Sequence, residues 1–525
     1  MIYRQISIAL IATLLTSVNV KAQPLLTQPK LLVNILVDQL RSDYLEAFVP
    51  LYGEDGFKKL LQQGMVYSNA SYSFSPIDRA SAITSLVTGT QPYYHSITGG
   101  MWLDKETLRP VLCIEDQQCE GIFTTDRVSP KNIATSTFLD ELKLASKGKG
   151  IIFSVSPFKD ASVLAGGHAA NGALWIDDKN GKWCTSTYYT QNSSTWLSAI
   201  NSLISPAQVA ITTIWEASSP LSANFSYFLS GDNQTVPFKH KFNTDGGYHE
   251  FKTSALVNEQ VTKLALQCIR GNAMGMDAIT DIVSVTYYAG TFNHEPVSDC
   301  QMELQDTYVR LDAEIGKLID ELEKTVGKNN LVFILTSTGC CDEESLSYFR
   351  YNIPTGNVDM VRTANLLNMY YGALWGSDKY IETTYNNQIF LNHKLLEQKR
   401  IGLKEATDRA QEFLCQLSGV RNTYTAQQLL TDTNQQIEKV RKGFHPERCG
   451  DVIIEISPGW NLQNPDYNHN KTYRSSFIPF PIIIYGSNYQ AQKISDAVSV
   501  EQIAPTVSKI IRIRAPNACS LQPLF

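Results

Sequence analysis

Six short apolar segments constrain the fold of this chain most strongly. Each is rich in Val, Ile, Leu or aromatic residues and has the length of one buried strand. They run from Leu31 to Val37, Gly150 to Val155, Ile282 to Tyr288, Leu331 to Thr336, Val452 to Ile456 and Pro481 to Tyr485. Continuous apolar strands of this kind are typical of parallel sheets that helices cover on both faces.

An amphipathic helix is predicted between two of these strands, from Leu304 to Val326, because its apolar residues recur with helical spacing. A strand, a helix and a strand in this order indicate a βαβ unit. A further helix is predicted from Ser499 to Ile511. The sequence therefore predicts an α/β fold with a doubly wound, mostly parallel sheet.

Two long stretches interrupt this alternation. The chain has 525 residues, of which 18% are charged and 43% hydrophobic, so its composition is that of a globular protein and excludes disorder, collagen and coiled coil as the main state. Within it, residues 177–276 and 341–448 approximately are predicted to be insertions at the ends of strands. Because ligands bind at the carboxyl ends of parallel strands, such insertions would form a cap over a binding cleft.

The N-terminus has the pattern of a secretory signal. Arg4 precedes an apolar stretch from Ile6 to Val18 that is short for a membrane span, and Val20-Lys21-Ala22 offers a cleavage site. We predict a signal peptide at 1–22 and a mature domain at 23–525, with an N-terminal anchor helix as the alternative. The mature protein is then periplasmic or secreted, with no membrane span after cleavage.

The net charge limits the kinds of partner to expect, and the cysteine content makes disulfides possible. The formal net charge of −6 argues against nucleic acid as a partner, because a nucleic-acid-binding protein presents a basic face. Export makes the ten cysteines candidates for disulfides, and Cys113 and Cys119 are near enough in sequence to close a short loop. Cys340 and Cys341 are adjacent, and their spacing does not define a pairing.

Asp38 follows directly after the first apolar strand. A carboxylate at the C-terminal tip of a buried strand is placed where a metal ligand or a catalytic acid would lie. An Asp that caps the following helix is an equal alternative for this residue taken alone.

Several blocks together resemble the alkaline phosphatase superfamily, in particular the PafA-type exported bacterial alkaline phosphatases and the type I phosphodiesterase–nucleotide pyrophosphatases. The blocks occur in consistent order from about residue 31 to the C-terminus. They are Val37–Leu45, Ser85–Pro92, His95–Ile97, Ser129–Ile133, Gly167–Trp175, Asp306–Asp312, Ile503–Val507 and Pro516–Cys519. The resemblance implies two zinc ions held by Asp and His, a Thr nucleophile, and an Asn, a Lys and an Arg that hold the phosphoryl oxygens.

The residues that the resemblance implies for phosphoryl transfer are largely replaced. Ungapped alignment from Thr88-Gly89 places Arg79 at the nucleophile position, and Gly100 takes the position of the Asn. The Lys and Arg positions fall on Phe158 and Asp160. A one-residue deletion would restore the Lys as Lys159, but the Arg position is then Ala161.

The implied metal ligands are also reduced. Gly290 takes the place of an Asp, while His294 is kept four residues later. The Asp-His pair after the Leu331 strand is replaced within Thr338-Gly339-Cys340, and the last His falls on Pro479 or Phe477. Only Asp38 and His294 remain of six ligands, and two ligands do not hold two zinc ions.

The sequence therefore predicts an exported pseudoenzyme, for which no cofactor is expected. It would bind an unknown envelope protein or a small ligand at the capped cleft. The alternative is a metal-dependent hydrolase of phosphate or sulfate esters with a rearranged site, in which Asp38, His294 and a residue among Asp78, Cys340, Cys341 and Asp342 hold a single zinc ion. A purely structural partner of an envelope complex is a third class, marked by a large exposed apolar patch.

Overall fold

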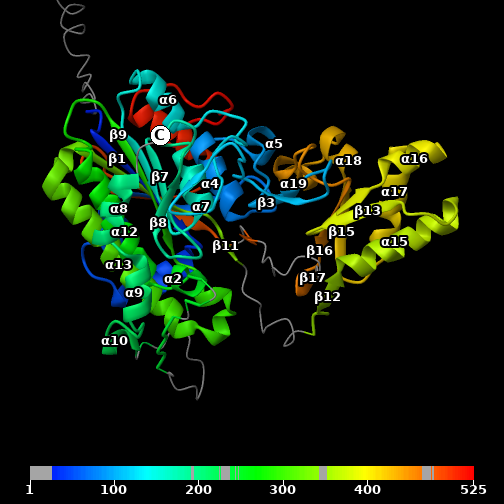
Figure 1. The fold of residues 1–525 in the computed structure, drawn as a ribbon, viewed down its shortest axis with the longest axis horizontal. Helices are drawn as coiled ribbons and strands as arrows, with labels where there is room; N and C mark the ends of the chain where they lie inside the picture. The colour runs from blue at the N-terminus through cyan, green and yellow to red at the C-terminus, as the bar shows by residue number, and fades with distance from the viewer. Residues whose placement is uncertain are drawn as a thin grey trace, which may run out of the picture.

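A ten-stranded mixed sheet forms the centre of the larger part of the molecule in the computed structural model (Figure 1). In spatial order its strands are β20 (Gln492–Ser499), β2 (Met65–Ser71), β19 (Phe480–Tyr485), β10 (Leu331–Ser337), β1 (Leu31–Asp38), β9 (Asp281–Tyr288), β6 (Ile152–Val155), β7 (Gly172–Ile176), β8 (Trp183–Ser186) and β5 (Gly121–Ile122). The central strands β10, β1, β9, β6 and β7 are parallel. The predicted α/β class with a mostly parallel sheet is confirmed.

The structure describes residues 27–190, 194–223, 225, 237–242, 244–245, 247–341, 352–463, 474–475 and 478–525. The predicted signal peptide at 1–22 lies outside these residues. Among the described residues, no helix combines the length and the apolar character that crossing a membrane requires.

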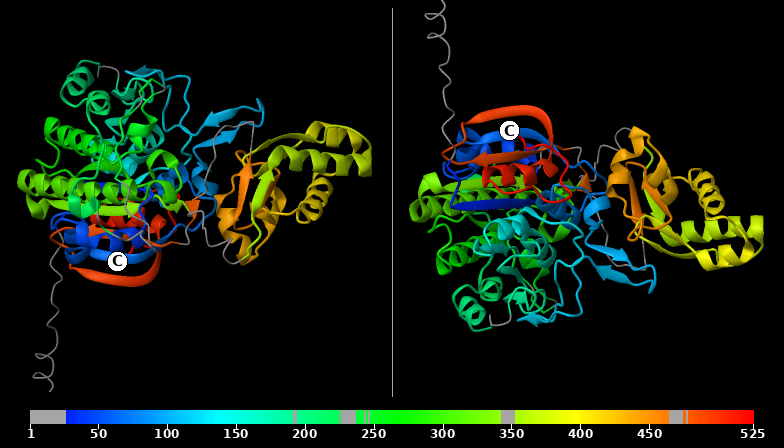
Figure 2. Two further views of the ribbon diagram at one scale, coloured as in Figure 1. Left: turned by 90° about the horizontal axis from the view of Figure 1, so that it is seen from below. Right: turned by 90° about the horizontal axis from the view of Figure 1, so that it is seen from above.

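Strand β1 contributes side chains to two hydrophobic cores, one on each face of the sheet, because its side chains alternate between the two faces. Val33, Ile35 and Val37 enter one core, while Leu32 and Leu36 enter the other. Helices pack on both faces (Figure 2). The first core contains side chains of α2 (Ser42–Ala47), α3 (Phe57–Gln63), α8 (Ser194–Leu203), α12 (Leu256–Gly271) and α13 (Gln301–Leu322). The second contains side chains of α4 (Arg79–Thr88), α6 (Phe138–Ala145), α7 (Lys159–Gly166) and α20 (Ile503–Ile510).

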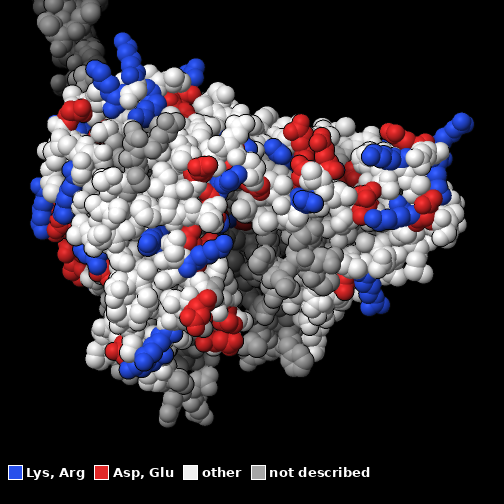
Figure 3. Space-filling model, viewed as in Figure 1, with Lys and Arg blue, Asp and Glu red and all other residues white. Residues whose placement is uncertain are grey.

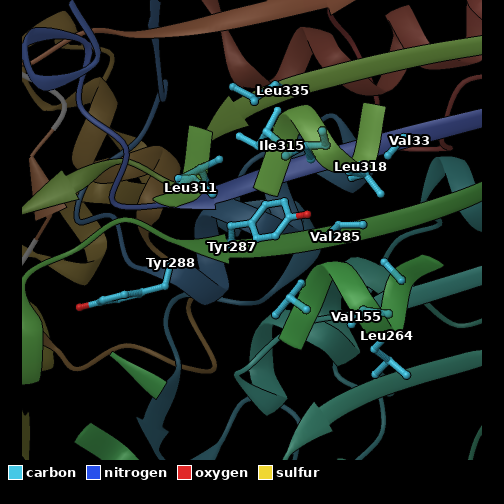
Figure 4. Close-up of a cluster of buried hydrophobic side chains, with 14 of the residues drawn as sticks. Val33, Val155, Leu264, Val285, Tyr287, Tyr288, Leu311, Ile315, Leu318 and Leu335 are labelled. Carbon is cyan, nitrogen blue, oxygen red and sulfur yellow. The ribbon is translucent and has the colours of Figure 1, made fainter. Parts of the chain in front are cut away.

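Figure 4 shows how the predicted amphipathic helix, α13, covers the sheet. Leu311, Ile315 and Leu318 project from it toward β1, β9 and β10. Tyr287 and Tyr288 of β9 both belong to this cluster, and their rings point in different directions.

A second lobe projects from one side of the main body (Figure 1). Its four-stranded antiparallel sheet has the order β13 (Ile381–Tyr385), β14 (Gln388–Leu391), β16 (Val452–Ile456) and β15 (Val420–Thr425). Its helices are α15 (Met360–Trp375), α16 (His393–Lys399), α17 (Leu403–Leu414), α18 (Ala426–Thr431) and α19 (Glu438–Gly443), and a short parallel pair joins β12 (Gly356–Asp359) to β17 (Trp460–Gln463). The lobe has a hydrophobic core of its own.

The hairpin of β3 (Met101–Leu103) and β4 (Pro110–Leu112) connects the body with this lobe. Leu103 packs with Tyr385 and Phe390 of the lobe, and the guanidinium of Arg448 lies 4.5 Å from the ring centre of Trp102. The remaining short elements are α5 (Pro92–His95), α9 (Pro206–Thr212), α10 (Pro220–Ala223), α11 (His249–Lys252), β11 (Cys340–Cys341) and β18 (Arg474–Ser475).

Two of the six strands that are predicted to be parallel are antiparallel to their neighbours in the structure. Val452–Ile456 is β16 and belongs to the antiparallel sheet of the lobe. The predicted Pro481–Tyr485 strand lies within β19, in the main sheet but antiparallel to both of its neighbours. Buried apolar strands of either direction have the same composition, so this pattern does not reveal strand direction.

Disulfides are absent among the eight cysteines whose side chains the structure describes, which include Cys113 and Cys119. The predicted short loop between these two is therefore not closed in the structure. The thiol of Cys119 instead donates to Asp116 Oδ2 at 3.5 Å.

His95, at the end of α5, holds helix α4 in place. It is fully buried, its Nε2 lies 2.8 Å from Ser85 Oγ, and its Nδ1 accepts a hydrogen bond from the Ile97 N–H at 3.1 Å. Burial lowers the pKa of His95 to about 3, with a smaller lowering from His445, so the imidazole is neutral in the folded protein.

This burial predicts an acid-sensitive fold. The unfolded chain protonates His95 near pH 6.5 and the folded chain near 3, so its contribution to stability is complete above 6.5 and falls with decreasing pH by about 1.4 kcal/mol per unit. We expect His95→Gln to reduce the slope of unfolding free energy against pH between pH 4 and 6, measured by urea denaturation. His393→Gln is the control, because Asp451 raises the pKa of His393 and its removal cannot reduce that slope. Equal slopes for wild type and His95→Gln would contradict the prediction.

Candidate functional site

Asp38 ends the central strand β1 and has no exposed surface. The adjacent parallel strands bring Thr338 and Tyr288 to the same edge of the sheet, and the Thr338 hydroxyl donates to Asp38 Oδ1 at 2.5 Å. Gln39 follows with a positive φ of 66°, so the chain turns sharply after the carboxylate. This edge, at the carboxyl ends of parallel strands, is where α/β proteins place their ligand sites.

Arg79, the first residue of α4, lies at the centre of the site. Its Nη1 donates to Asp38 Oδ2 at 3.2 Å, while its Nε and Nη2 donate to Asp160 Oδ2 and Oδ1 at 3.0 and 2.8 Å. The guanidinium thus bridges a buried carboxylate and a second carboxylate at the start of α7, in the bidentate geometry that makes such pairs strong. Its central carbon also lies 3.9 Å from the ring centre of Phe158.

The charge of Arg79 is secured by these neighbours. Burial lowers the pKa of Arg79, but Asp160 and Asp38 raise it more, so that it lies above its ordinary value. The side chain keeps 21% of its surface exposed, whereas Asp38 keeps none. Removing one partner of a buried ion pair costs about 3–5 kcal/mol, because the remaining charge is left uncompensated.

Asp78 fills the N-terminal end of α4. Its Oδ1 accepts from the Ser81 N–H at 2.9 Å in a capping box, and its Oδ2 accepts from the Gly100 N–H at 2.5 Å. A Cβ on Gly99 would lie 3.1 Å from this Oδ2, and one on Gly100 would lie 3.6 Å from it. The anion position that a helix N-terminus offers is therefore filled by the protein's own carboxylate.

A second group of charges, centred on Asp178, also lies near Phe158. Lys159 Nζ contacts Asp126 Oδ1 at 2.9 Å and Asp178 Oδ2 at 3.5 Å. The almost fully buried Lys252 donates to Asp178 Oδ1 at 2.5 Å. Burial raises the pKa of Asp178, but Lys252 and Lys159 lower it to about 2. Lys159, the candidate for the phosphate-holding Lys, is thus turned toward two carboxylates.

The space beside Gly290 is occupied. A Cβ at this position would lie 2.6 Å from Tyr288 Oη and 2.7 Å from both Cδ and Nε2 of Gln39. An Asp at position 290 would therefore require both of these side chains to move. The Gln39 amide and the Tyr288 hydroxyl fill the space in which the resemblance places a metal ligand.

His294 lies apart from the Arg79 bridge. It is exposed at the end of a short 3₁₀ turn (Phe292–His294), and its Nδ1 lies 3.4 Å from Tyr288 Oη. Asn293 and His294 both have positive φ angles, of 51° and 58°. The structure thus places Asp38 against Arg79 and Thr338, and His294 against Tyr288.

The described residues do not fit a pair of zinc ions. In the part of the chain that the structure describes, no three His, Cys, Asp or Glu side chains gather as a metal ion requires. The side chains of Cys340 and Cys341 are not described, and Asp342 and Phe477 lie outside the described residues. The carbonyl of Pro479 accepts from Ser42 Oγ at 2.5 Å.

Sequence reasoning missed the partnership of Arg79 with Asp160 and the role of Asp78 as a cap. The available signal was the new cation itself: an Arg at the start of a buried helix needs carboxylates near it, and Asp38 is predicted at the tip of the first strand. The capping function of Asp78 could have been inferred from Ser81 three residues later.

Comparison with known proteins agrees with this fold. The family described as type I phosphodiesterase / nucleotide pyrophosphatase matches residues 32–477. The chain is 28% identical to alkaline phosphatase PafA of Elizabethkingia meningoseptica, over 95% of this chain and 94% of the relative. It is 26% identical to alkaline phosphatase PhoV of Synechococcus elongatus, over 93% and 91%. The crystal structure of wild-type alkaline phosphatase PafA superimposes with a TM-score of 0.82, covering 95% of this chain and 98% of that one.

The position of Asp78 leads to a stability prediction. Asp78→Ala removes the cap of α4 and the acceptor of the Gly100 N–H, so we expect the free energy of unfolding to fall by about 1–3 kcal/mol. Urea denaturation measures the change. Glu106→Ala is the matched control, because it removes an exposed carboxylate nearby and should change stability by less than about 0.5 kcal/mol. Equal effects of the two variants would show that Asp78 does not hold the helix end.

Proposed function

The chain belongs to the type I phosphodiesterase / nucleotide pyrophosphatase family, within the alkaline phosphatase superfamily, and on this premise we propose that it is a pseudoenzyme. It keeps the phosphoesterase fold and works by binding rather than by hydrolysis. The bridge from Arg79 to Asp38 and Asp160 is the observation that carries this proposal.

Arg79 cannot do the work of a nucleophile. Its guanidinium is always protonated, and Asp160 and Asp38 raise its pKa further. A nucleophile needs a lone pair that a base or a metal ion can expose, and a protonated guanidinium offers none. The neighbouring Ser81 hydroxyl is committed to the capping box with Asp78.

The charges around Arg79 also oppose a phosphoryl group. Asp38, Asp160 and Asp78 place three carboxylates around the start of α4, against the single cation of Arg79. A phosphate ester carries negative charge and would meet repulsion here. Catalysis of phosphoryl transfer instead requires donors and cations directed at the oxygens of the group.

The binding partner that we propose is an envelope protein or a small ligand at the capped cleft that the sequence predicts. This rests on the export predicted from residues 1–22, which also supports a periplasmic or secreted location. Figure 3 shows Lys and Arg interspersed with Asp and Glu on the visible face, without one large basic field. Such a surface supports a partner other than nucleic acid.

A hydrolase with a rearranged site is the second candidate, and the comparisons favour it over the pseudoenzyme. Its support is that both curated relatives are named alkaline phosphatases and match nearly the whole chain. This candidate needs a single zinc ion held by Asp38, His294 and a further residue among Asp78, Cys340, Cys341 and Asp342. It would act on phosphate or sulfate esters.

An activity assay separates the two candidates. We expect purified protein supplied with zinc to hydrolyse neither p-nitrophenyl phosphate nor bis-p-nitrophenyl phosphate nor p-nitrophenyl sulfate above the buffer rate. The reason is that the site lacks a nucleophile and an open cation. Zinc content, measured by mass spectrometry of the same sample, should be substoichiometric.

The controls for this assay are two Asp variants. Turnover that Asp38→Ala abolishes and Asp496→Ala leaves intact would refute the pseudoenzyme and establish the hydrolase, because Asp496 is an exposed carboxylate on the edge strand β20. Turnover that survives Asp38→Ala would come from a contaminating phosphatase, which repurification removes. The expected result is a rate equal to buffer for all three proteins.

A further inference from the structure

We infer that Arg79 is the resident cation of this site, supplied by the chain itself beside Asp38, the residue that the resemblance implies as a metal ligand. The inference rests on the proposed function, because it takes this site to be built without zinc. It goes further in assigning to Arg79 the electrostatic role of the metal. The fold of this protein then does not depend on a metal ion.

The first support is the position of the guanidinium. It lies between carboxylates from two different elements, Asp38 of β1 and Asp160 of α7, and makes three hydrogen bonds to them. A charged carboxylate without exposed surface, such as Asp38, requires a nearby cation. Arg79 meets this requirement from a third element, α4, and so joins three parts of the body.

The second support is that the neighbouring cations are engaged elsewhere. Lys159 contacts Asp126 and Asp178, and Lys252 contacts Asp178 and the Ile176 carbonyl. Lys252 Nζ also lies 5.2 Å from the ring centre of Phe158. Arg79, in contrast, is paired with Asp38 at 3.2 Å.

The third support is that side chains of the protein itself occupy positions around the bridge. Gln39 and Tyr288 fill the space beside Gly290, and Asp78 fills the end of α4. A zinc ion takes about three protein ligands and holds them at about 2.0–2.3 Å. The described side chains do not provide such a set.

A guanidinium differs from a metal ion in two respects that matter here. It is tethered, so that no chelator removes it, and it stays protonated through the physiological range. The stability of this protein should therefore be independent of metal supply, whereas a metal-dependent relative would lose stability with its ions.

The test is the thermal midpoint of full-length mature protein with EDTA, with Mn²⁺ and with Zn²⁺. For wild type we expect the same midpoint in all three conditions. Arg79→Ala should unfold several degrees lower in EDTA, because Asp38 and Asp160 lose their shared cation. Added Mn²⁺ or Zn²⁺ should recover part of that loss, because the ion can enter the space between the two carboxylates.

Two matched variants show whether charge is the cause. Arg79→Ala combined with Asp38→Asn should not respond to Mn²⁺, because the buried charge is gone. Arg79→Lys keeps a cation without the bidentate geometry and should be insensitive to EDTA. If Arg79→Ala does not fold in EDTA, its refolding yield with and without Mn²⁺ gives the same comparison.

An EDTA-sensitive midpoint for wild type, restored by Zn²⁺, would overturn the inference. So would an Arg79→Ala variant as stable as wild type, or one on which divalent ions act no more than on wild type. These outcomes are distinct from failure of the proposed function. Hydrolysis by a protein whose midpoint ignores EDTA would refute the pseudoenzyme alone, whereas EDTA sensitivity without hydrolysis would refute the resident cation alone.

Discussion

The buried charge of Asp38 is the constraint on which the rest of the site depends. This carboxylate ends the central strand of a sheet that is covered on both faces, so water cannot solvate its charge. An isolated charge in such surroundings is too costly to persist, and it must be paired or protonated. The Thr338 hydroxyl and the Arg79 guanidinium provide that pairing. Helix α4 is thereby fixed to the sheet at its first residue.

Other departures from the family pattern lie around the bridge from Arg79 to Asp38 and Asp160. Asp160 completes the environment of the guanidinium, and Phe158 covers its face. Asp78 caps the helix that carries Arg79 and also holds the Gly100 N–H. The site is a packed, hydrogen-bonded structure built from the same strand ends that would carry catalysis.

Much of the fold could be predicted from the sequence, because strand burial and helix amphipathicity leave a local signal. Predicted segments such as Leu31 to Val37 and Ile282 to Tyr288 match β1 and β9 to within one residue. Strand direction and sheet membership could not be predicted, since β16 and β19 have the same apolar composition as the parallel strands. These properties depend on contacts far apart in the chain.

For the site, residue identities could be predicted and partnerships could not. Comparison with the family pattern places Arg79 and Gly290 at positions where the expected functional residue is replaced. It places Asp38 and His294 at positions where the expected metal ligand is kept. The contact between Arg79 and Asp160 joins residues 81 positions apart and leaves no trace in local pattern. The filling of the space beside Gly290 by Gln39 likewise depends on the turn that follows β1. The replaced positions could therefore be predicted from the sequence, whereas the interactions that now fill them could not.

The most direct test of the account is a crystal structure of the protein grown with zinc, with anomalous diffraction recorded at the zinc absorption edge. We predict no anomalous peak at the carboxyl ends of β1, β9 and β10, and electron density for the Arg79 guanidinium between Asp38 and Asp160. An anomalous peak bonded to Asp38, with the Arg79 side chain turned out of the site, would contradict the account.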